Sequence, residues 1–380
     1  MPRKRTLWLT QLALMVALGC GGTTSSGGPA DVSVETSDVD AELPDVGGEL
    51  PDAEQDGTSS PWPGVTHLVF ATEFSDDQVA TDDDVCFGDI TGLEGLETGA
   101  PFGQARIYFE GGSVAQRSVD IVADPDDPTG NTVLYTRIDE PNVISGAKCG
   151  DNPVPENPCA TAASAAKHKS RIQFVLLDNV GLKSFNYRVR LRLGAGFGVL
   201  AQETYAQNTP GRAPLDLHWM TIAEFWNDLP NENDYPFRVT LGAHPHLEKG
   251  IVLTLKGDKR VTQPDGTFKW EHLWDEEEYV ADFAVPIEQW FTIHVSMVEG
   301  DASTGRTVLS LVESDGSLTT LLDVQGFTHH PDMPASMLNG FKDINPIKLY
   351  TSGELTCGLK AAGLPLEIWW DDFAIGAPAP

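Results

Sequence analysis

Three arginines occupy alternate positions within one short segment of the chain. Arg188, Arg190 and Arg192 lie in residues 186–193, and the positions between them carry apolar side chains. Because side chains alternate between the two faces of a strand, this pattern predicts a strand with all three arginines on one face. Arginine binds carboxylate and sulfate groups bidentately, so that face could hold an acidic ligand. The alternative is a solvated face on which the arginines pair with Asp or Glu of neighbouring strands.

Several histidine and tyrosine side chains could transfer a proton. His294 lies on the polar face of a predicted strand, and Tyr350 follows Lys348 by two positions. A general acid or base must lie within hydrogen-bond reach of the proton that it moves. Each histidine could equally be structural. Further histidine candidates are His168 and His218.

Aromatic and polar residues could also bind a sugar without cleaving it. Sugar rings stack on aromatic side chains, while polar groups fix their orientation. We predict ligand contacts from His218, Glu224, Trp226 and Lys348. The alternative for any tryptophan is a place in the protein core. The histidines of His244-Pro245-His246 lack the helical spacing and third ligand of a zinc site, so the sequence does not favour zinc there.

The elements that would position these residues are strands. Turn signals such as Pro264-Asp265-Gly266 separate short runs of alternating or β-branched residues. Only 160–169 has helical composition, and we expect one helical turn at 221–226. Many short strands with few helices predict an all-β sandwich or jelly roll. The predicted strands are 65–74, 131–138, 171–177, 185–193, 237–241, 250–255, 290–298, 307–313, 318–324, 347–351 and 367–375.

Short motifs resemble those of concanavalin-like jelly rolls. Residues 367–376 resemble the closing strand of that family, and 287–295 resemble its tryptophan-then-strand element. Lys169-Ser170-Arg171, 223–226 and Lys348-Leu349-Tyr350 resemble strands of the polysaccharide lyases of this fold, such as the alginate lyases and heparin lyase I. The resemblance implies a concanavalin-like β-jelly roll, a two-sheet antiparallel sandwich.

The resemblance also implies a catalytic arrangement. In jelly-roll lyases a basic strand neutralises the carboxylate of a uronic sugar, which acidifies the proton to be removed. That role would fall to Arg188, Arg190 and Arg192, with His294 and Tyr350 as base and acid.

This sequence departs from the enzymes of the fold in two places. The alginate lyases carry a catalytic tyrosine two residues before the lysine that Lys348 matches, and Pro346 stands there in this chain. The hydrolases of the fold take two carboxylates from one strand in a Glu-x-Asp-x-x-Glu pattern, which neither 276–278 nor 371–372 shows. The sequence therefore favours binding, with β-elimination as the alternative.

The same resemblance implies one structural calcium. Concanavalin-like domains often hold a calcium ion between their first strand and the closing aspartate, and Glu73 and Asp372 match those positions. Calcium takes carboxylate and carbonyl oxygens from loops. Ordinary surface charge is the alternative for both residues.

The first residues resemble a bacterial lipoprotein signal. Arg3-Lys4-Arg5 precedes the apolar stretch 7–18, which is too short to span a bilayer, and Gly19 precedes Cys20. In that family the cysteine receives a diacylglyceryl group and the chain is cut before it, so Cys20 would anchor an exported protein to the cell envelope. In the family's sorting pattern Gly21, rather than aspartate, indicates the outer membrane. An ordinary secretory signal is the alternative.

Composition divides the chain into a signal peptide (1–19), an acidic linker (20–61) and a jelly-roll domain (62–380). The linker has ten acidic residues and no basic one within 31–56, so we expect it to stay disordered. Of the net charge of −31, the signal contributes +3 and the linker −10, which leaves −24 for the domain. A surface this acidic repels nucleic acid at long range.

Four cysteines remain after Cys20, an even number that suits disulfides in an oxidising compartment. We predict Cys149–Cys159, which would pin a turn-rich loop. Cys86–Cys357 would then join the start and the end of the domain.

Together these observations predict a cell-envelope lipoprotein that recognises a glycan through its jelly-roll domain. The alternatives are a polysaccharide lyase that cleaves a uronic-acid polymer by β-elimination and a structural or adhesive envelope protein. The expected partners are a glycan and, through Cys20, a membrane, but no nucleic acid.

Overall fold

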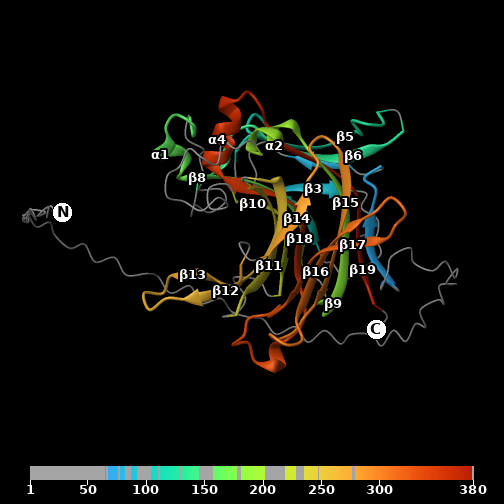
Figure 1. The fold of residues 1–380 in the computed structure, drawn as a ribbon. Helices are drawn as coiled ribbons and strands as arrows, with labels where there is room; N and C mark the ends of the chain where they lie inside the picture. The colour runs from blue at the N-terminus through green and yellow to red at the C-terminus, as the bar shows by residue number, and fades with distance from the viewer. Residues whose placement is uncertain are drawn as a thin grey trace, which may run out of the picture. The chain divides into compact units, whose positions relative to one another are not determined.

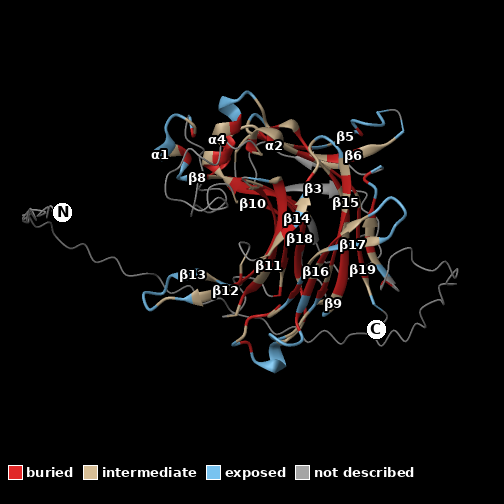
Figure 2. Cartoon of the chain, viewed as in Figure 1, coloured by how far each residue is buried: buried red, intermediate tan, exposed pale blue. Residues whose placement is uncertain are grey.

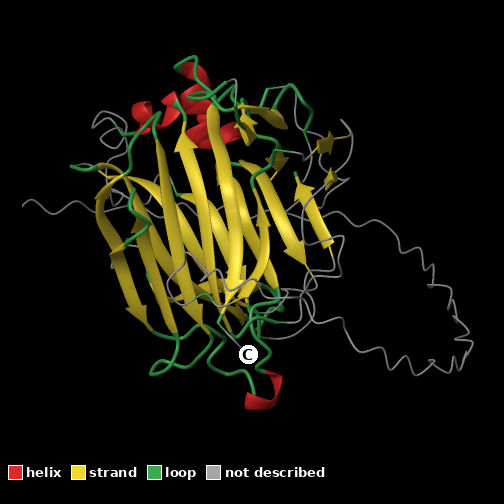
Figure 3. Ribbon diagram, turned by 90° about the vertical axis from the view of Figure 1, so that its right-hand side faces the viewer, coloured by secondary structure: helices red, strands yellow, loops and turns green. Residues whose placement is uncertain are grey.

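Antiparallel β-strands dominate the structure, which is a computed structural model. It describes residues 65, 67–75, 78–81, 87–91, 104–109, 112–128, 130–144, 157–177, 181–201, 219–227, 235–246, 248–275 and 279–378. The strands form two facing sheets (Figures 1 and 3), so the predicted two-sheet jelly roll is confirmed. The predicted signal peptide and linker lie outside the described residues.

Sheet A has the strand order β17-β16-β15-β9-β19-β6-β5, and β1 also pairs with β19. Its neighbouring strands all pair in the antiparallel sense. Its strands are β1 (His67–Thr72), β5 (Arg117–Ala123), β6 (Thr132–Ile138), β9 (Ser184–Leu193), β15 (Trp290–Val298), β16 (Arg306–Val312), β17 (Leu318–Gln325) and β19 (Leu366–Ala377).

Sheet B has the order β13-β12-β11-β10-β18-β8-β4-β3-β2, with β14 beside β12 and β7 beside β8. It is antiparallel as well. Its strands are β2 (Gln78–Thr81), β3 (Phe87–Thr91), β4 (Gln104–Tyr108), β7 (Val143–Ile144), β8 (His168–Leu177), β10 (Met220–Trp226), β11 (Phe237–His246), β12 (Gly250–Thr262), β13 (Phe268–Trp274), β14 (Val280–Ala284) and β18 (Asp343–Ser352).

The core lies between the two sheets, where the buried strand faces meet (Figure 2). On β9 the alternation works as predicted, because Tyr187, Val189 and Leu191 are fully buried while the arginines between them are only half-buried. Tyr187 packs against Phe225 of sheet B, with ring centroids 5.4 Å apart. Its hydroxyl donates a hydrogen bond to the carbonyl oxygen of Pro346 across the core, at 2.6 Å. This bond satisfies the one polar atom of an otherwise apolar side chain.

The expected helical turn at 221–226 is wrong, because these residues belong to β10. A register shift between Thr221 and Ala223 interrupts the pairing with β11. Such a bulge puts one extra residue on a strand and breaks the period-2 pattern by which strands are recognised. A second shift, between Ile344 and Ile347, hides the alternation of β18 in the same way.

Helices are short and few in the described chain: α1 (Ala162–Ala165), α2 (Ala195–Leu200), the 3₁₀ turn η1 (Ala335–Met337) and α4 (Gly353–Ala361). The helix predicted at 160–169 is limited to α1, because β8 already begins at His168. In α1 the Thr161 hydroxyl caps the first turn by accepting from the Ser164 amide at 3.0 Å. None of these helices has the length and apolar character needed to cross a bilayer.

The described disulfide joins Cys159 to Cys357, with Cα atoms 5.3 Å apart. Both predicted pairings, Cys149–Cys159 and Cys86–Cys357, are therefore wrong, and Cys86 and Cys149 lie outside the described residues. The prediction paired Cys159 with the cysteine close to it in sequence, but α4 packs beside α1 and β8 and so brings Cys357 to Cys159 over a separation of 198 residues.

Candidate functional site

The three arginines of β9 lie on the outer face of sheet A, where carboxylates and aromatic rings surround them. Arg190 binds Asp371 through Nη1 and Oδ2 at 2.7 Å, and it lies 3.6 Å from Asp124. Its guanidinium also lies 4.2 Å from the ring centroid of Trp290. Arg192 has the same kind of surroundings, with Asp126 at 3.6 Å. These two arginines fit the alternative of a face paired with neighbouring acids.

His294 is buried on the same sheet, directly opposite Arg188 in the register of β15 and β9. Burial, and next the charge of Arg188, lower the pKa of His294 to about 4. The imidazole is therefore neutral at pH 7. His294 and the arginines thus belong to sheet A, whereas Tyr350 belongs to sheet B, so the structure does not bring this predicted catalytic set together.

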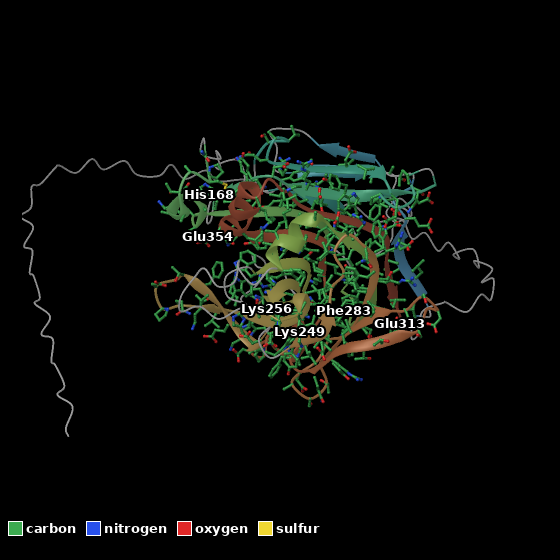
Figure 4. All side chains as sticks on the ribbon, turned by 45° about the horizontal axis from the view of Figure 1, so that its top comes forward. His168, Lys249, Lys256, Phe283, Glu313 and Glu354 are labelled. Carbon is green, nitrogen blue, oxygen red and sulfur yellow. A yellow bond between two sulfur atoms is a disulfide. The ribbon has the colours of Figure 1, made fainter. Side chains whose placement is uncertain are left out.

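The two remaining histidine candidates do not join a site. His168 is buried beside the start of α4, near Glu354 (Figure 4), and its Nδ1 lies 2.6 Å from the carbonyl oxygen of Ser164. That contact ties β8 to α1 and is structural. His218 lies outside the described residues.

Sheet B, by contrast, collects the predicted Glu224, Trp226, Lys348 and Tyr350. Glu224 on β10 and Lys348 on β18 form an ion pair and are each about 2% exposed. Glu224 also accepts from Arg238 at 3.2 Å and from the indole nitrogen of Trp226 at 3.3 Å. One carboxylate therefore connects three neighbouring strands.

The protonation of this pair follows from its surroundings. Burial would raise the pKa of Glu224, but the charges of Lys348 and Arg238 outweigh it and lower the pKa to about 2. Burial lowers the pKa of Lys348 to about 7, against the opposing effect of Glu224. The carboxylate is thus fixed as an anion, and the ammonium gives up its proton more readily than a surface lysine does.

Tyr350 lies among three cations. Lys169 on β8 donates to its phenolic oxygen at 2.9 Å. The guanidinium of Arg171 lies 4.1 Å from the centre of its ring, and the Nζ atom of Lys348 lies 4.8 Å from it. The ring of Trp219 packs against one side of Tyr350, with the two ring centroids 4.7 Å apart. An anionic group brought to this hydroxyl would meet positive charge from two strands.

The charged residues continue from Glu224 to the edge of sheet B. Arg238 donates to Asp258 at 3.0 Å, and Asp258 lies 2.6 Å from Nδ1 of His272. Trp226, Arg238, Asp258 and His272 are successive partners in register, so they form one row across β10, β11, β12 and β13. The row ends at the half-exposed His272.

His244 is the residue with proton-transfer chemistry that the sequence analysis did not assign to the site. It is 3% exposed, and a Cβ atom added at Gly242 would lie 2.4 Å from its Nε2, so the imidazole lies over Gly242. Gly242 pairs with Thr221, which in turn pairs with Tyr350. The imidazole therefore lies over the row of residues that contains Tyr350. In the sequence, the pattern His244-Pro245-His246 bears only on a zinc site, which it does not favour.

Little in the sequence identifies the other members of this cluster. Lys169 and Arg171 stand out only through the motif at the start of β8, and no motif marks Arg238, Asp258 or His272. Their association depends on strand order, which no local pattern contains. Arg238 and Lys348 bind the carboxylates of Glu224 and Asp258, while Lys169 binds the phenol of Tyr350.

The residues predicted to hold calcium lie where β1 ends beside β19. Thr72, the last residue of β1, pairs with Phe373, so Glu73 follows β1 directly and Asp372 precedes the paired residue on β19. Two carboxylates are fewer ligands than the roughly six to eight oxygens that calcium takes. The neighbouring Asp371 is bound to Arg190 and Asn131. Among the described residues no group of three or more His, Cys, Asp or Glu could hold a metal ion, so we derive no chemistry from calcium here.

Comparison with known proteins gives the chain no family. No protein-family model matches it, and no curated protein matches it. Similar solved structures include an endo-β-1,4-glucuronan lyase from the fungus Trichoderma reesei (12% identity, covering 69% of this chain and 87% of that one, TM-score 0.36). They also include alginate lyase Aly36B (11% identity, covering 80% of this chain and 97% of that one, TM-score 0.36). A third is the PL-14 alginate lyase from Aplysia kurodai (8% identity, covering 69% of this chain and 87% of that one, TM-score 0.39). At these identities and TM-scores the likeness does not indicate an activity.

Proposed function

We propose that the outer face of sheet B binds an acidic polysaccharide and cleaves it by β-elimination at Tyr350. The observation that carries this proposal is the position of the Tyr350 phenol among Lys169, Arg171 and Lys348. A uronic sugar has a carboxylate next to the carbon that loses its proton. Cations at that carboxylate stabilise the negative charge that develops on it as the proton leaves.

The reaction needs a base and an acid at one sugar. The base removes the proton from C5, the electron pair of that bond forms the C4–C5 double bond, and the bond from C4 to the bridging oxygen breaks. The departing oxygen then takes a proton from the acid. Tyr350 and His244 are two groups on this face that can exchange a proton, and Arg171 with Lys169 would hold the carboxylate.

Glycan recognition without cleavage is the second candidate. It is favoured by the aromatic residues Trp226 and Trp270, whose ring centroids lie 5.5 Å apart beside the charged cluster. Aromatic rings bind the apolar faces of sugars without taking part in chemistry.

One assay separates the two functions. The domain is incubated with a panel of uronic-acid polysaccharides, and the ultraviolet absorbance of the new unsaturated carboxylate is followed. We expect Tyr350→Phe to lower the rate at least about 100-fold, because it removes the proton-transfer group. Arg190→Ala on sheet A is the matched control and should leave the rate unchanged. Binding of a polymer with no absorbance change would support recognition alone, and an active Tyr350→Phe variant would exclude Tyr350 as the catalytic group.

We further propose, from the sequence, that Cys20 carries a lipid and attaches the protein to the outer membrane. Cells grown with a clickable fatty acid should label the wild-type protein and leave Cys20→Ser unlabelled. Labelling that survives in Cys20→Ser would contradict this proposal.

A further inference from the structure

The hairpin of β12 and β13 extends beyond its neighbouring strand. The pairing of β11 with β12 begins at Phe237 and Lys259, whereas β12 continues to Thr262 and pairs with β13 from Phe268 onward. In Figure 1 the two strands project away from the rest of sheet B. The turn of the hairpin closes where the Gly266 amide donates to the carbonyl oxygen of Gln263 at 2.9 Å.

The base of this hairpin is firmly anchored. Trp274 is buried, and its indole nitrogen donates to the carbonyl oxygen of Phe327 at 2.9 Å. A Cβ atom added at Gly257 would lie 2.3 Å from the Trp274 ring, so the strand and the ring are in close contact there. The hairpin therefore holds its tip in a defined place relative to the sheet.

Aromatic rings line one face of the hairpin and lead to the proposed active site. Phe268 at the tip is 57% exposed, so its ring is accessible to a ligand. Its ring lies 6.2 Å from that of Trp270, which in turn lies 5.5 Å from that of Trp226. Trp226 donates to Glu224 at the charged cluster. The three rings thus form a continuous aromatic row from the cluster to the tip.

Arginines accompany this aromatic row. The guanidinium of Arg238 lies 4.5 Å from the centre of the Trp270 ring and 5.5 Å from that of Trp226. Arg260 lies 5.4 Å from the centre of the Phe268 ring. Rings that bind the apolar face of a sugar and arginines that bind carboxylates match the two chemical features of a uronic-acid polymer.

We propose that the aromatic row of Trp226, Trp270 and Phe268 is an extended binding subsite for sugar units of an acidic polysaccharide, remote from the unit that lies at Tyr350. This inference rests on the proposed function for its ligand. Four strand spacings separate β18 from β13, which is roughly 19 Å at the usual interstrand distance. Only a polymer of several sugar units reaches from Tyr350 to Phe268, and a short oligomer leaves the hairpin unused.

The test is a binding measurement that does not depend on cleavage. The Tyr350→Phe background removes turnover, and calorimetry gives the Kd of a long uronic-acid polymer and of a trisaccharide of the same sugar. We expect Phe268→Ala to weaken polymer binding about three- to tenfold, as loss of one aromatic contact does, and to leave trisaccharide binding unchanged. Leu68→Ala is the matched control, since Leu68 is 54% exposed on β1 of the other sheet.

Each outcome has a distinct meaning. Equal polymer affinity in Phe268→Ala and its parent would overturn the subsite, and so would an equal loss for the trisaccharide. If the wild-type protein cleaves the polymer and Phe268→Ala weakens polymer binding, both proposals are supported. If the wild-type protein binds the polymer without cleaving it and Phe268→Ala weakens that binding, the lyase function is excluded and the subsite is kept. If no polymer on the panel bound to the parent protein, both proposals would fail together.

Discussion

The outer faces of the two sheets carry similar residues in different arrangements. On sheet A, Arg190 lies against Asp371 and Asp124 and is stacked on Trp290, so its charge is already balanced. On sheet B, Lys169 and Arg171 gather around the phenol of Tyr350. Arginines bound to carboxylates support a fold, whereas cations beside a group that can transfer a proton can also receive an anion. The number of arginines on a strand therefore says less about function than what faces them.

The largest expected difference between the two sheets is in stability, when the Glu224 carboxylate is removed. Glu224→Ala leaves Lys348 buried without its partner, so we expect the free energy of unfolding to fall by about 3–5 kcal/mol in urea denaturation. Arg190 of sheet A is 28% exposed at its side chain and its partner Asp371 keeps Asn131 as a donor, so Arg190→Ala should cost less than Glu224→Ala.

A double variant checks the cause of that loss. Glu224→Leu combined with Lys348→Met replaces both charges with apolar groups of similar size, and we expect it to recover most of the stability. If the double variant were as unstable as Glu224→Ala, the loss would come from packing and not from an unpaired charge.

The next largest effect concerns activity. Arg171→Ala should lower the rate of elimination by about 10²–10³-fold, because it removes a cation that stabilises developing charge on the substrate. Arg192→Ala is the counterpart on sheet A, and its rate should stay at the wild-type value. Equal losses in the two variants, with folding intact by circular dichroism, would show that both faces contribute.

The dependence of stability on acidic pH tests sheet A, on which His294 lies. The pKa of His294 is lowered to about 4, so the unfolded chain binds a proton there before the folded protein does. Stability should therefore fall as pH decreases from about 6.5 to about 4, by up to roughly 3 kcal/mol. His294→Phe should flatten this part of the profile of unfolding free energy against pH. A profile that His294→Phe leaves unchanged would assign the loss to other groups.

His272 on sheet B should show the opposite sign and the smallest effect. The hydrogen bond to Asp258 raises the pKa of His272. The charge of Asp275 raises it by a smaller amount, and the charge of Lys256 lowers it. The stabilisation is complete below about pH 6.5 and disappears as pH rises through the folded pKa. Because the side chain is 47% exposed, solvent screening keeps the effect small. His272→Asn should remove the slope above pH 6.5, and a slope that persists would contradict this assignment.

The sequence predicts the architecture better than the site. Alternation identifies β9 and its buried face correctly, because Tyr187 and Val189 sit in a regular strand. It misses β10, where a bulge near Ala223 breaks the period. The predicted strand 347–351 likewise covers β18 only after its shift between Ile344 and Ile347, and both β10 and β18 contribute residues to the site.

The site itself depends on information that a strand does not contain. Lys169 and Arg171 alternate on β8 much as the arginines alternate on β9, and nothing in either segment tells which sheet it joins. Four predicted residues do meet on sheet B, while His294 lies on sheet A. The separation follows from strand order, which is set by the whole chain. Cys357 shows the same limit, since its partner Cys159 is near in space and far in sequence.

The place of β19 has a consequence for the order in which the protein can be assembled. This strand, residues Leu366–Ala377, lies inside sheet A between β9 and β6, and its Trp370 is fully buried. During synthesis, β6 and β9 emerge long before it and have no neighbour to fill the gap between them. The sandwich therefore closes only after residues 366–377 have been synthesised and released from the ribosome. A chain that ends before Leu366 keeps β6 and β9 as unpaired edges, which are prone to pair with strands of other chains.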